Sequence, residues 1–108
     1  MFEKSNFKNR KAEKIILKKA SEFIQKESNR QSLITVTNIS TSKDFQNATI
    51  FVTVFPEHKE EAGIDFLKRN QKEFKNYIKK ETRLNKIPHF EFQIDSGEKS
   101  RQRIEELL

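Results

Sequence analysis

The sequence predicts an α+β domain of two layers, in which helices cover one face of a three-stranded sheet. Two long segments place apolar residues at helical spacing, and three shorter segments place them at alternate positions or are rich in β-branched residues. Of the 108 residues, 33% are hydrophobic and 35% are charged, so the core must be thin. Two layers suit a thin core better than a thick sandwich, and we expect residues 1–108 to form one domain.

The first helix is predicted between about Lys8 and Lys26. Its apolar residues recur at helical spacing: Ala12, Ile15, Ile16, Ala20, Phe23 and Ile24. The opposite side carries Lys11, Lys14 and Lys18, which form a basic face.

Two strands follow a polar connector. Residues 33–40 (LITVTNIS) are β-branched and rich in threonine, and residues 48–55 (ATIFVTVF) alternate between two faces. Turn-forming residues lie between them at 41–47, so the two strands most simply form an antiparallel hairpin. Pro56 cannot donate a hydrogen bond to a sheet and ends the second strand.

A long basic helix is predicted next, from Ile64 to about Arg83. Carboxylates at residues 57–61 suit its positive N-terminal end, while Gly63 near its start is a weakness of about 1 kcal/mol relative to alanine. One stripe of the helix is apolar: Ile64, Leu67, Phe74 and Ile78. A second stripe is cationic: Lys68, Lys72, Lys75, Lys79, Arg83 and Lys86. Gln71 interrupts the apolar stripe, so a bend near Asn70 is left open.

The third strand is predicted at residues 89–95 (HFEFQID). Phe90, Phe92 and Ile94 point inward, and His89, Glu91 and Gln93 point outward. Ser96 and Gly97 turn the chain, and a short final helix is expected over residues 100–108, with Ile104, Leu107 and Leu108 apolar.

Charge is distributed unevenly along the chain, whose net charge is +6. Residues 1–30 carry +5 and residues 68–86 carry +6, whereas residues 31–67 carry −3 and residues 87–108 carry −2. Two basic segments beside an acidic remainder favour nucleic acid or an anionic surface as the partner. Because lysine outnumbers arginine, we expect contacts with phosphates more than bidentate contacts with bases.

The sequence offers little for catalysis or metal binding. The absence of cysteine excludes disulfides, thiolate nucleophiles and Cys-based metal sites, and it fits a reducing cytoplasm. His58 and His89 lack metal-ligand spacing, and Glu60–Glu61 and Glu105–Glu106 are adjacent on helices and so point in different directions. We therefore expect no enzyme, no cofactor and no metal. No apolar run is long enough to span a bilayer, so we also expect no membrane partner.

The order of elements is similar to that of KH modules, but the GxxG loop that clamps nucleic acid in those modules is absent. More specifically, the chain resembles the ribosome-binding factor A family of bacterial small-subunit assembly proteins along nearly its whole length. The segment 84–95 (LNKIPHFEFQID) resembles the family's L-R-x-x-P-x-L-x-F-x-x-D signature, and 101–108 its closing R-I-x-x-L-L. Residues 37–44 resemble its V-x-x-S-x-D pattern, residues 48–54 its A-x-V-Y-V strand, and Arg10 with Ala12 and Ile15 its opening helix motif.

The resemblance implies a type II KH-like fold and a non-enzymatic cytoplasmic factor that binds the free small (30S) subunit and its rRNA during late maturation. The family's Ala-x-Gly kink would fall at Asn70-Gln71-Lys72, where this chain has neither alanine nor glycine. We expect the protein to be monomeric when free. The residues expected to bind RNA are Arg10, Lys11, Lys14, Lys18, Lys68, Lys72, Lys75, Lys79 and Arg83.

Two alternatives from other classes stay open at this point. The chain could be a protein–protein module, such as a homodimer through a sheet edge, with its lysines serving solubility. It could also be a small hydrolase with an unrecognised site. Concentration-dependent mass without nucleic-acid affinity would favour the first, and turnover that survives further purification would favour the second.

Overall fold

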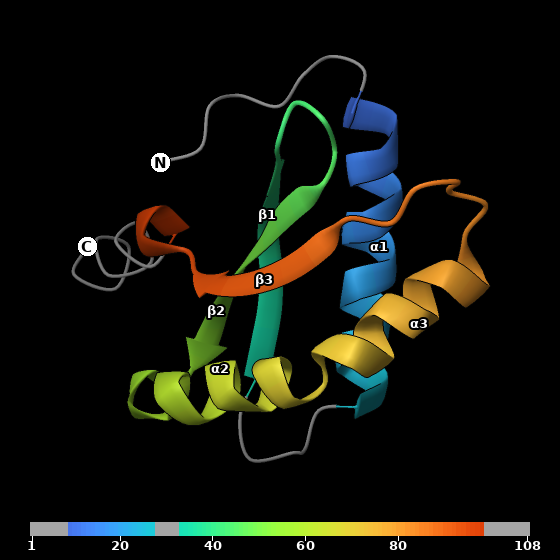
Figure 1. Ribbon diagram of the computed structural model, residues 1–108. Coiled ribbons are helices and arrows are strands. Elements are labelled where there is room, and N and C mark those ends of the chain that lie inside the picture. Colours follow the sequence, from blue (N-terminus) through green and yellow to red (C-terminus); the bar gives the residue numbers. More distant parts are fainter. Residues whose placement is uncertain (1–8, 28–32, 99–108) are drawn as a thin grey trace.

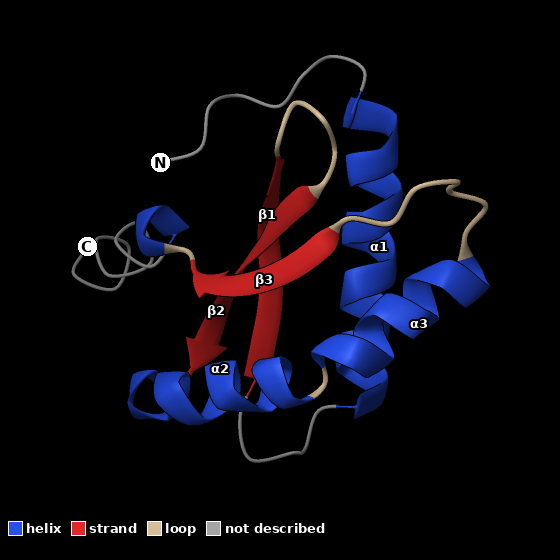
Figure 2. Cartoon of the chain, in the orientation of Figure 1, coloured by secondary structure: helices blue, strands red, loops and turns tan. Residues whose placement is uncertain are grey.

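The computed structural model describes residues 9–27 and 33–98. Its elements follow the order α1 (Arg10–Glu27), β1 (Leu33–Thr41), β2 (Asn47–Phe55), the 3₁₀ helix η2 (Glu57–Lys59), α2 (Glu60–Arg69), α3 (Gln71–Glu81) and β3 (His89–Ile94) (Figure 1). The first helix, the hairpin strands and the third strand are confirmed to within two residues of their predicted bounds. The predicted α+β architecture is confirmed as well (Figure 2).

The three strands lie in the order β1-β2-β3. β1 and β2 pair antiparallel from Leu33–Phe55 to Thr41–Ala48, with a bulge between Val36 and Asn38. β3 pairs parallel to β2, with His89 beside Asn47 and Ile94 beside Val52. A parallel pair requires a crossover connection, and α2 and α3 supply it between β2 and β3.

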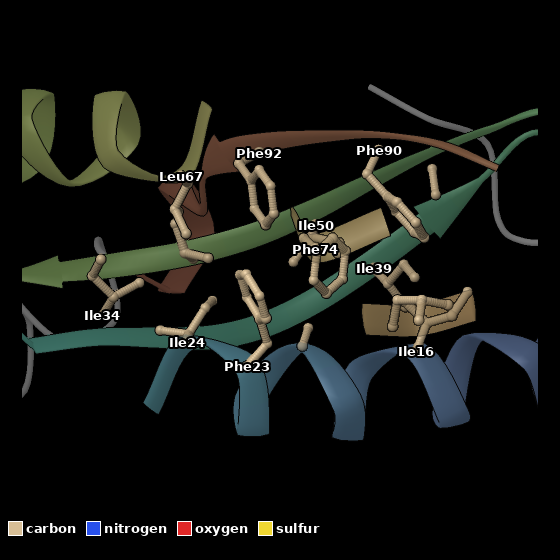
Figure 3. Packing of buried hydrophobic residues seen from close by; sticks show 14 of the residues in the cluster. Ile16, Phe23, Ile24, Ile34, Ile39, Ile50, Leu67, Phe74, Phe90 and Phe92 are labelled. Carbon is tan, nitrogen blue, oxygen red and sulfur yellow. The ribbon is translucent and has the colours of Figure 1, made fainter. Parts of the chain in front are cut away.

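The core lies between one face of the sheet and the helices. Phe74 of α3 is fully buried at its centre, with ring-to-ring distances of 5.4 Å to Phe23 of α1, 4.7 Å to Phe90 and 5.6 Å to Phe92 (Figure 3). Offset and edge-on contacts of this kind add stability beyond the area they bury. The predicted inward orientation of Phe74, Phe90 and Phe92 is confirmed, and Ile94 packs half-buried at the margin of the core.

The N-terminal end of α1 is fixed to the end of the hairpin by a buried polar cluster. The Thr41 hydroxyl donates to a Glu13 carboxylate oxygen at 2.7 Å. The Asn9 amide donates to the Thr41 hydroxyl at 3.0 Å and to the Ser42 carbonyl at 2.9 Å. Because these groups are buried, losing one partner would leave another unsatisfied, so the cluster sets how α1 lies on the sheet.

One prediction about the elements needs correction. The single helix expected from Ile64 to about Arg83 is two helices that change direction at Asn70, and the second ends at Glu81 (Figure 1). Ser96 and Gly97, which were expected to turn the chain, lie in a helical turn over residues 96–98. The final helix predicted over residues 100–108 lies outside the described residues.

Candidate nucleic-acid interface

The break between α2 and α3 is formed by the side chain and backbone of Asn70. Its amide donates to the Phe66 carbonyl at 2.8 Å, and its backbone N–H reaches the carbonyls of Phe66 and Leu67. Its own carbonyl accepts from the N–H of Phe74 at 2.9 Å, which begins the next helix. The backbone of Asn70, at φ −100° and ψ 12°, lies in the region that helix ends and turns use. The bend left open by the sequence is therefore a complete break.

Gln71 connects the junction between α2 and α3 to the edge of the sheet by a hydrogen bond. Its side-chain amide donates to the Phe90 carbonyl of β3, the outer strand beside β2. The polar side chain that interrupts the apolar stripe thus satisfies a carbonyl that β2 does not reach. Asn70 and Gln71 together hold this junction.

Gly63 allows α2 to approach β2 closely. A Cβ atom on Gly63 would lie 2.9 Å from Cγ2 and 3.1 Å from Cγ1 of Val54, distances at which one side must shift. The helix-propensity cost expected at Gly63 is therefore only part of its role, because the missing side chain also lets the helix pack on the strand.

α3 presents lysines on its outer side, while the apolar residues of its inner side are buried in the core. Phe74 and Ile78 are fully buried, and Lys72 and Lys79 are exposed. Lys75 is half-buried, so its stem packs along the protein. These three lysines, which we call the α3 basic face, sit on a helix whose orientation is fixed by the aromatic core.

The other cations of the predicted stripe do not continue this face along one helix. Lys68 lies on α2, before the change of direction, and Arg83 and Lys86 lie beyond the end of α3. Lys86 turns back to the β1–β2 turn, where its ammonium donates to the Asp44 carbonyl at 2.7 Å. The prediction of one continuous cationic stripe from Lys68 to Lys86 is wrong, because it assumed a single helix.

α1 carries the second group of predicted cations. Arg10, Lys11, Lys14 and Lys18 are exposed, on the sides of the helix away from its buried residues. α1 packs directly on α3, where Phe23 meets Tyr77 at 5.4 Å between ring centres and the Lys26 ammonium lies 5.7 Å from the Tyr77 ring centre. The two basic groups therefore belong to two helices of one packed layer.

The turn contacted by Lys86 has its own internal order. The Ser42 hydroxyl donates to Asp44 Oδ1 at 2.7 Å and the Gln46 N–H donates to the same oxygen at 3.1 Å. These hydrogen bonds, chiefly the one from Ser42, hold the pKa of Asp44 below its ordinary value. The lowered pKa favours the ionised carboxylate, which is the form that accepts both hydrogen bonds.

Within residues 9–27 and 33–98, no cluster of three or more histidine or acidic side chains is arranged to hold a metal ion. In the same ranges, no helix combines the length and the apolar character that crossing a membrane requires. Both histidines are exposed.

Sequence reasoning named four residues that shape this surface but missed the contacts through which they do so: Gly63, Asn70, Gln71 and Lys86. The interruption of the apolar stripe was a signal for Gln71, but its partner on β3 lies 19 positions away. The Lys86–Asp44 contact joins residues 42 positions apart, and no periodic pattern could have indicated it.

Comparison with known proteins gives a consistent result. A protein-family model described as "Ribosome-binding factor A" matches residues 8–108. A relative of that name from Fervidobacterium nodosum is 30% identical over 79 residues, covering 72% of this chain. The match covers 63% of that relative, so this chain spans less than two thirds of its length.

Two structural comparisons agree with the family match. The crystal structure of ribosome-binding factor A from Thermus thermophilus superposes with a TM-score of 0.72 at 24% identity, covering 80% of this chain and 93% of that one, and shows a shared fold. A Thermus thermophilus RbfA homology model fitted into a cryo-EM map of a 30S–RbfA complex superposes with a TM-score of 0.67 at 25% identity, covering 76% of this chain and 89% of that one.

Proposed function

Because this chain belongs to the ribosome-binding factor A family, we propose that it binds the free small ribosomal subunit and its rRNA during late maturation and rRNA processing. The complex of the Thermus thermophilus protein with the 30S subunit supports this partner. In this proposal the protein is a cytoplasmic assembly factor whose contribution is binding rather than catalysis.

The observation that carries the proposal is the construction of α3. Its inner side is fixed by Phe74 and Ile78, while its outer side presents Lys72 and Lys79 to solvent with Lys75 at the flank. Lysines held on a rigid helix can neutralise several phosphates at once without ordering a flexible segment. Lys68, Arg83 and the cations of α1 extend this basic surface in the proposal: Arg10, Lys11, Lys14 and Lys18.

Binding through phosphates makes the affinity depend on salt. Each phosphate contacted should contribute a slope of roughly −0.7 to −0.9 to a plot of log affinity against log salt concentration. Such contacts carry little sequence information, so preference for the small subunit would come from the shape of its folded RNA.

The alternative of a homodimer through the free sheet edge has less support. Gln71 already occupies the Phe90 carbonyl on that edge of β3, and contacts from α2 and α3 lie along the same strand. An incoming strand would have to displace this hydrogen bond before pairing.

The test is co-sedimentation of the protein with isolated small subunits, large subunits and unstructured RNA across a salt series. The proposal predicts a preference for small subunits that persists as salt rises. Equal binding to small subunits, large subunits and unstructured RNA that disappears as salt rises would contradict the proposal. It would show that the basic surface attracts any polyanion without selecting the small subunit.

A further inference from the structure

The face of the sheet away from α1, α2 and α3 ends in an apolar pair. Leu33 of β1 lies directly opposite Phe55 of β2, and their side chains are 65% and 68% exposed. Phe51 lies on the same face, because side chains four residues apart on a strand point to the same side. We call these three side chains the outer apolar patch.

The centre of this face is covered, although the helices lie elsewhere. Thr49 alternates with the inward residues of β2, yet it is only 2% exposed, and Ser40 opposite it is 9% exposed. The helices pack on the other face, where Gly63 meets Val54 and Phe74 meets Phe90.

The chain itself turns toward this face after β3. The Thr37 hydroxyl, from the bulge of β1, donates to Asp95 Oδ2 at 2.5 Å, and β2 lies between these two strands. The other oxygen of Asp95 accepts the N–H of Glu98 at 3.0 Å, a helix N-cap contact that starts the helical turn at residues 96–98. In Figure 1 this turn follows the end of β3 that lies away from α1 and α3.

We infer that residues 99–108 of this chain dock on the outer apolar patch. The segment places Ile104, Leu107 and Leu108 at the i, i+3, i+4 spacing of one helix face. As a helix its ten residues span about 15 Å. The strand from Phe51 to Phe55 spans about 13 Å, so the lengths match. This docking is independent of subunit binding, since the basic groups lie on α1, α2 and α3.

Two other occupants are conceivable and are separated by the test. A second copy of the chain could cover the patch, or residues 1–8 could do so with Phe2 and Phe7. The C-terminal segment is favoured because Asp95 and its cap direct that part of the chain onto this face.

The test measures how fast a single introduced cysteine reacts with a thiol reagent. The sequence contains no cysteine, so the introduced thiol is the only one that reacts. Full-length Leu107→Cys and Glu106→Cys proteins are treated with a thiol reagent under native conditions. Glu106 lies away from the apolar stripe of the segment and is the matched control. We expect the thiol at position 107 to react about tenfold more slowly, as a locally packed side chain does. The Leu33→Asp/Phe55→Asp background, which alters only exposed side chains, should abolish the difference.

Several results would overturn the inference. Equal rates at positions 106 and 107 would show that the segment is not docked. Protection that persists in the Leu33→Asp/Phe55→Asp background would place it elsewhere. Protection that grows with protein concentration would identify a second copy. Protection of a thiol in Phe2→Cys or Phe7→Cys that this background removes, with position 107 reactive, would assign the patch to the N-terminal segment.

Discussion

The side-chain amide of Asn70 donates to the carbonyl of Phe66, 2.8 Å away, and thereby ends one helix at the residue whose own carbonyl begins the next. The direction of α3, and with it the position of its lysines, depends on this junction. A short polar side chain here ends one helix, and the carbonyl of the same residue starts the next.

Replacing Asn70 by alanine should lower the free energy of unfolding by about 1 kcal/mol, because a part-buried hydrogen bond to the Phe66 carbonyl is lost. The measurement is urea denaturation. Asn76→Ala is the matched control, since Asn76 is exposed on α3. An Asn76→Ala protein destabilised as much as the Asn70→Ala protein would show that the amide contact is not responsible.

Lysine replacements on the α3 basic face test the proposed RNA contacts. Changing Lys72, Lys75 and Lys79 together to glutamate should abolish binding to small subunits while leaving the circular dichroism spectrum unchanged. The control changes Lys26, Lys43 and Lys59 to glutamate, an equal change in net charge dispersed over α1, the β1–β2 turn and η2. Retained binding of the first variant at moderate salt would refute the assignment of this face.

Gly63→Ala should destabilise the protein although alanine is the better helix former. The favourable helix propensity is about 1 kcal/mol, whereas overpacking of a core contact costs about 1–3 kcal/mol, and here the methyl group would meet Val54 at 2.9 Å. Gly97→Ala is the control, because its methyl group would meet Asp95 at an ordinary 3.5 Å. If Val54→Ala relieved none of the Gly63→Ala effect in a double-mutant cycle, the close approach would not be its cause.

Phe92→Ala should cost about 3–5 kcal/mol of stability, because this ring is 6% exposed and packs on Phe74 in the core. Phe55→Ala removes the same side chain from an exposed position and serves as the comparison. Thermal or chemical unfolding measures both. Equal stability of the two variants would mean that the inward register of β3 is incorrect.

Asp44 should give stability a specific dependence on pH. Its pKa is lower in the folded protein than its ordinary value, chiefly because the Ser42 hydroxyl donates to the ionised carboxylate. The stabilisation is therefore present above the unfolded-state pKa, and it disappears as the pH falls below about 4 and passes the folded-state pKa. The difference in melting temperature between the wild-type and Asp44→Asn proteins should be constant near neutral pH and shrink in acid. A difference that does not change with pH would contradict this account of the turn.

Some features of the fold were predictable because they repeat along the chain. The apolar spacing of α1 and the alternation of β2 and β3 each indicate, from neighbouring residues alone, which side of the element is buried. All three elements were confirmed. The end of β2 at Phe55 followed from Pro56, whose missing N–H is a property of one residue. The core positions of Phe74, Phe90 and Phe92 followed from the same periodicities.

The sequence predicted which residues make up the candidate site but not how the helices arrange them in space. The sequence identified the lysines of α3, but it placed Lys68, Arg83 and Lys86 with them on one helix that does not exist. The interruption at Gln71 could be seen, yet its meaning depended on the Phe90 carbonyl of another strand. Gly63 was judged by helix propensity alone, because its contact with Val54 cannot be seen within the helix.

By itself the sequence determined α1, the three strands, the inward faces and the concentration of positive charge in two segments, since these depend on spacing along the chain. Tertiary structure decided the parallel pairing of β3 with β2, the break at Asn70 and the close approach of α2 to the sheet. These features depend on hydrogen bonds and steric contacts between residues distant in sequence, such as Gln71 with Phe90 and Lys86 with Asp44. Contacts of that kind exist only once the chain has packed, because the groups that make them have no local signal.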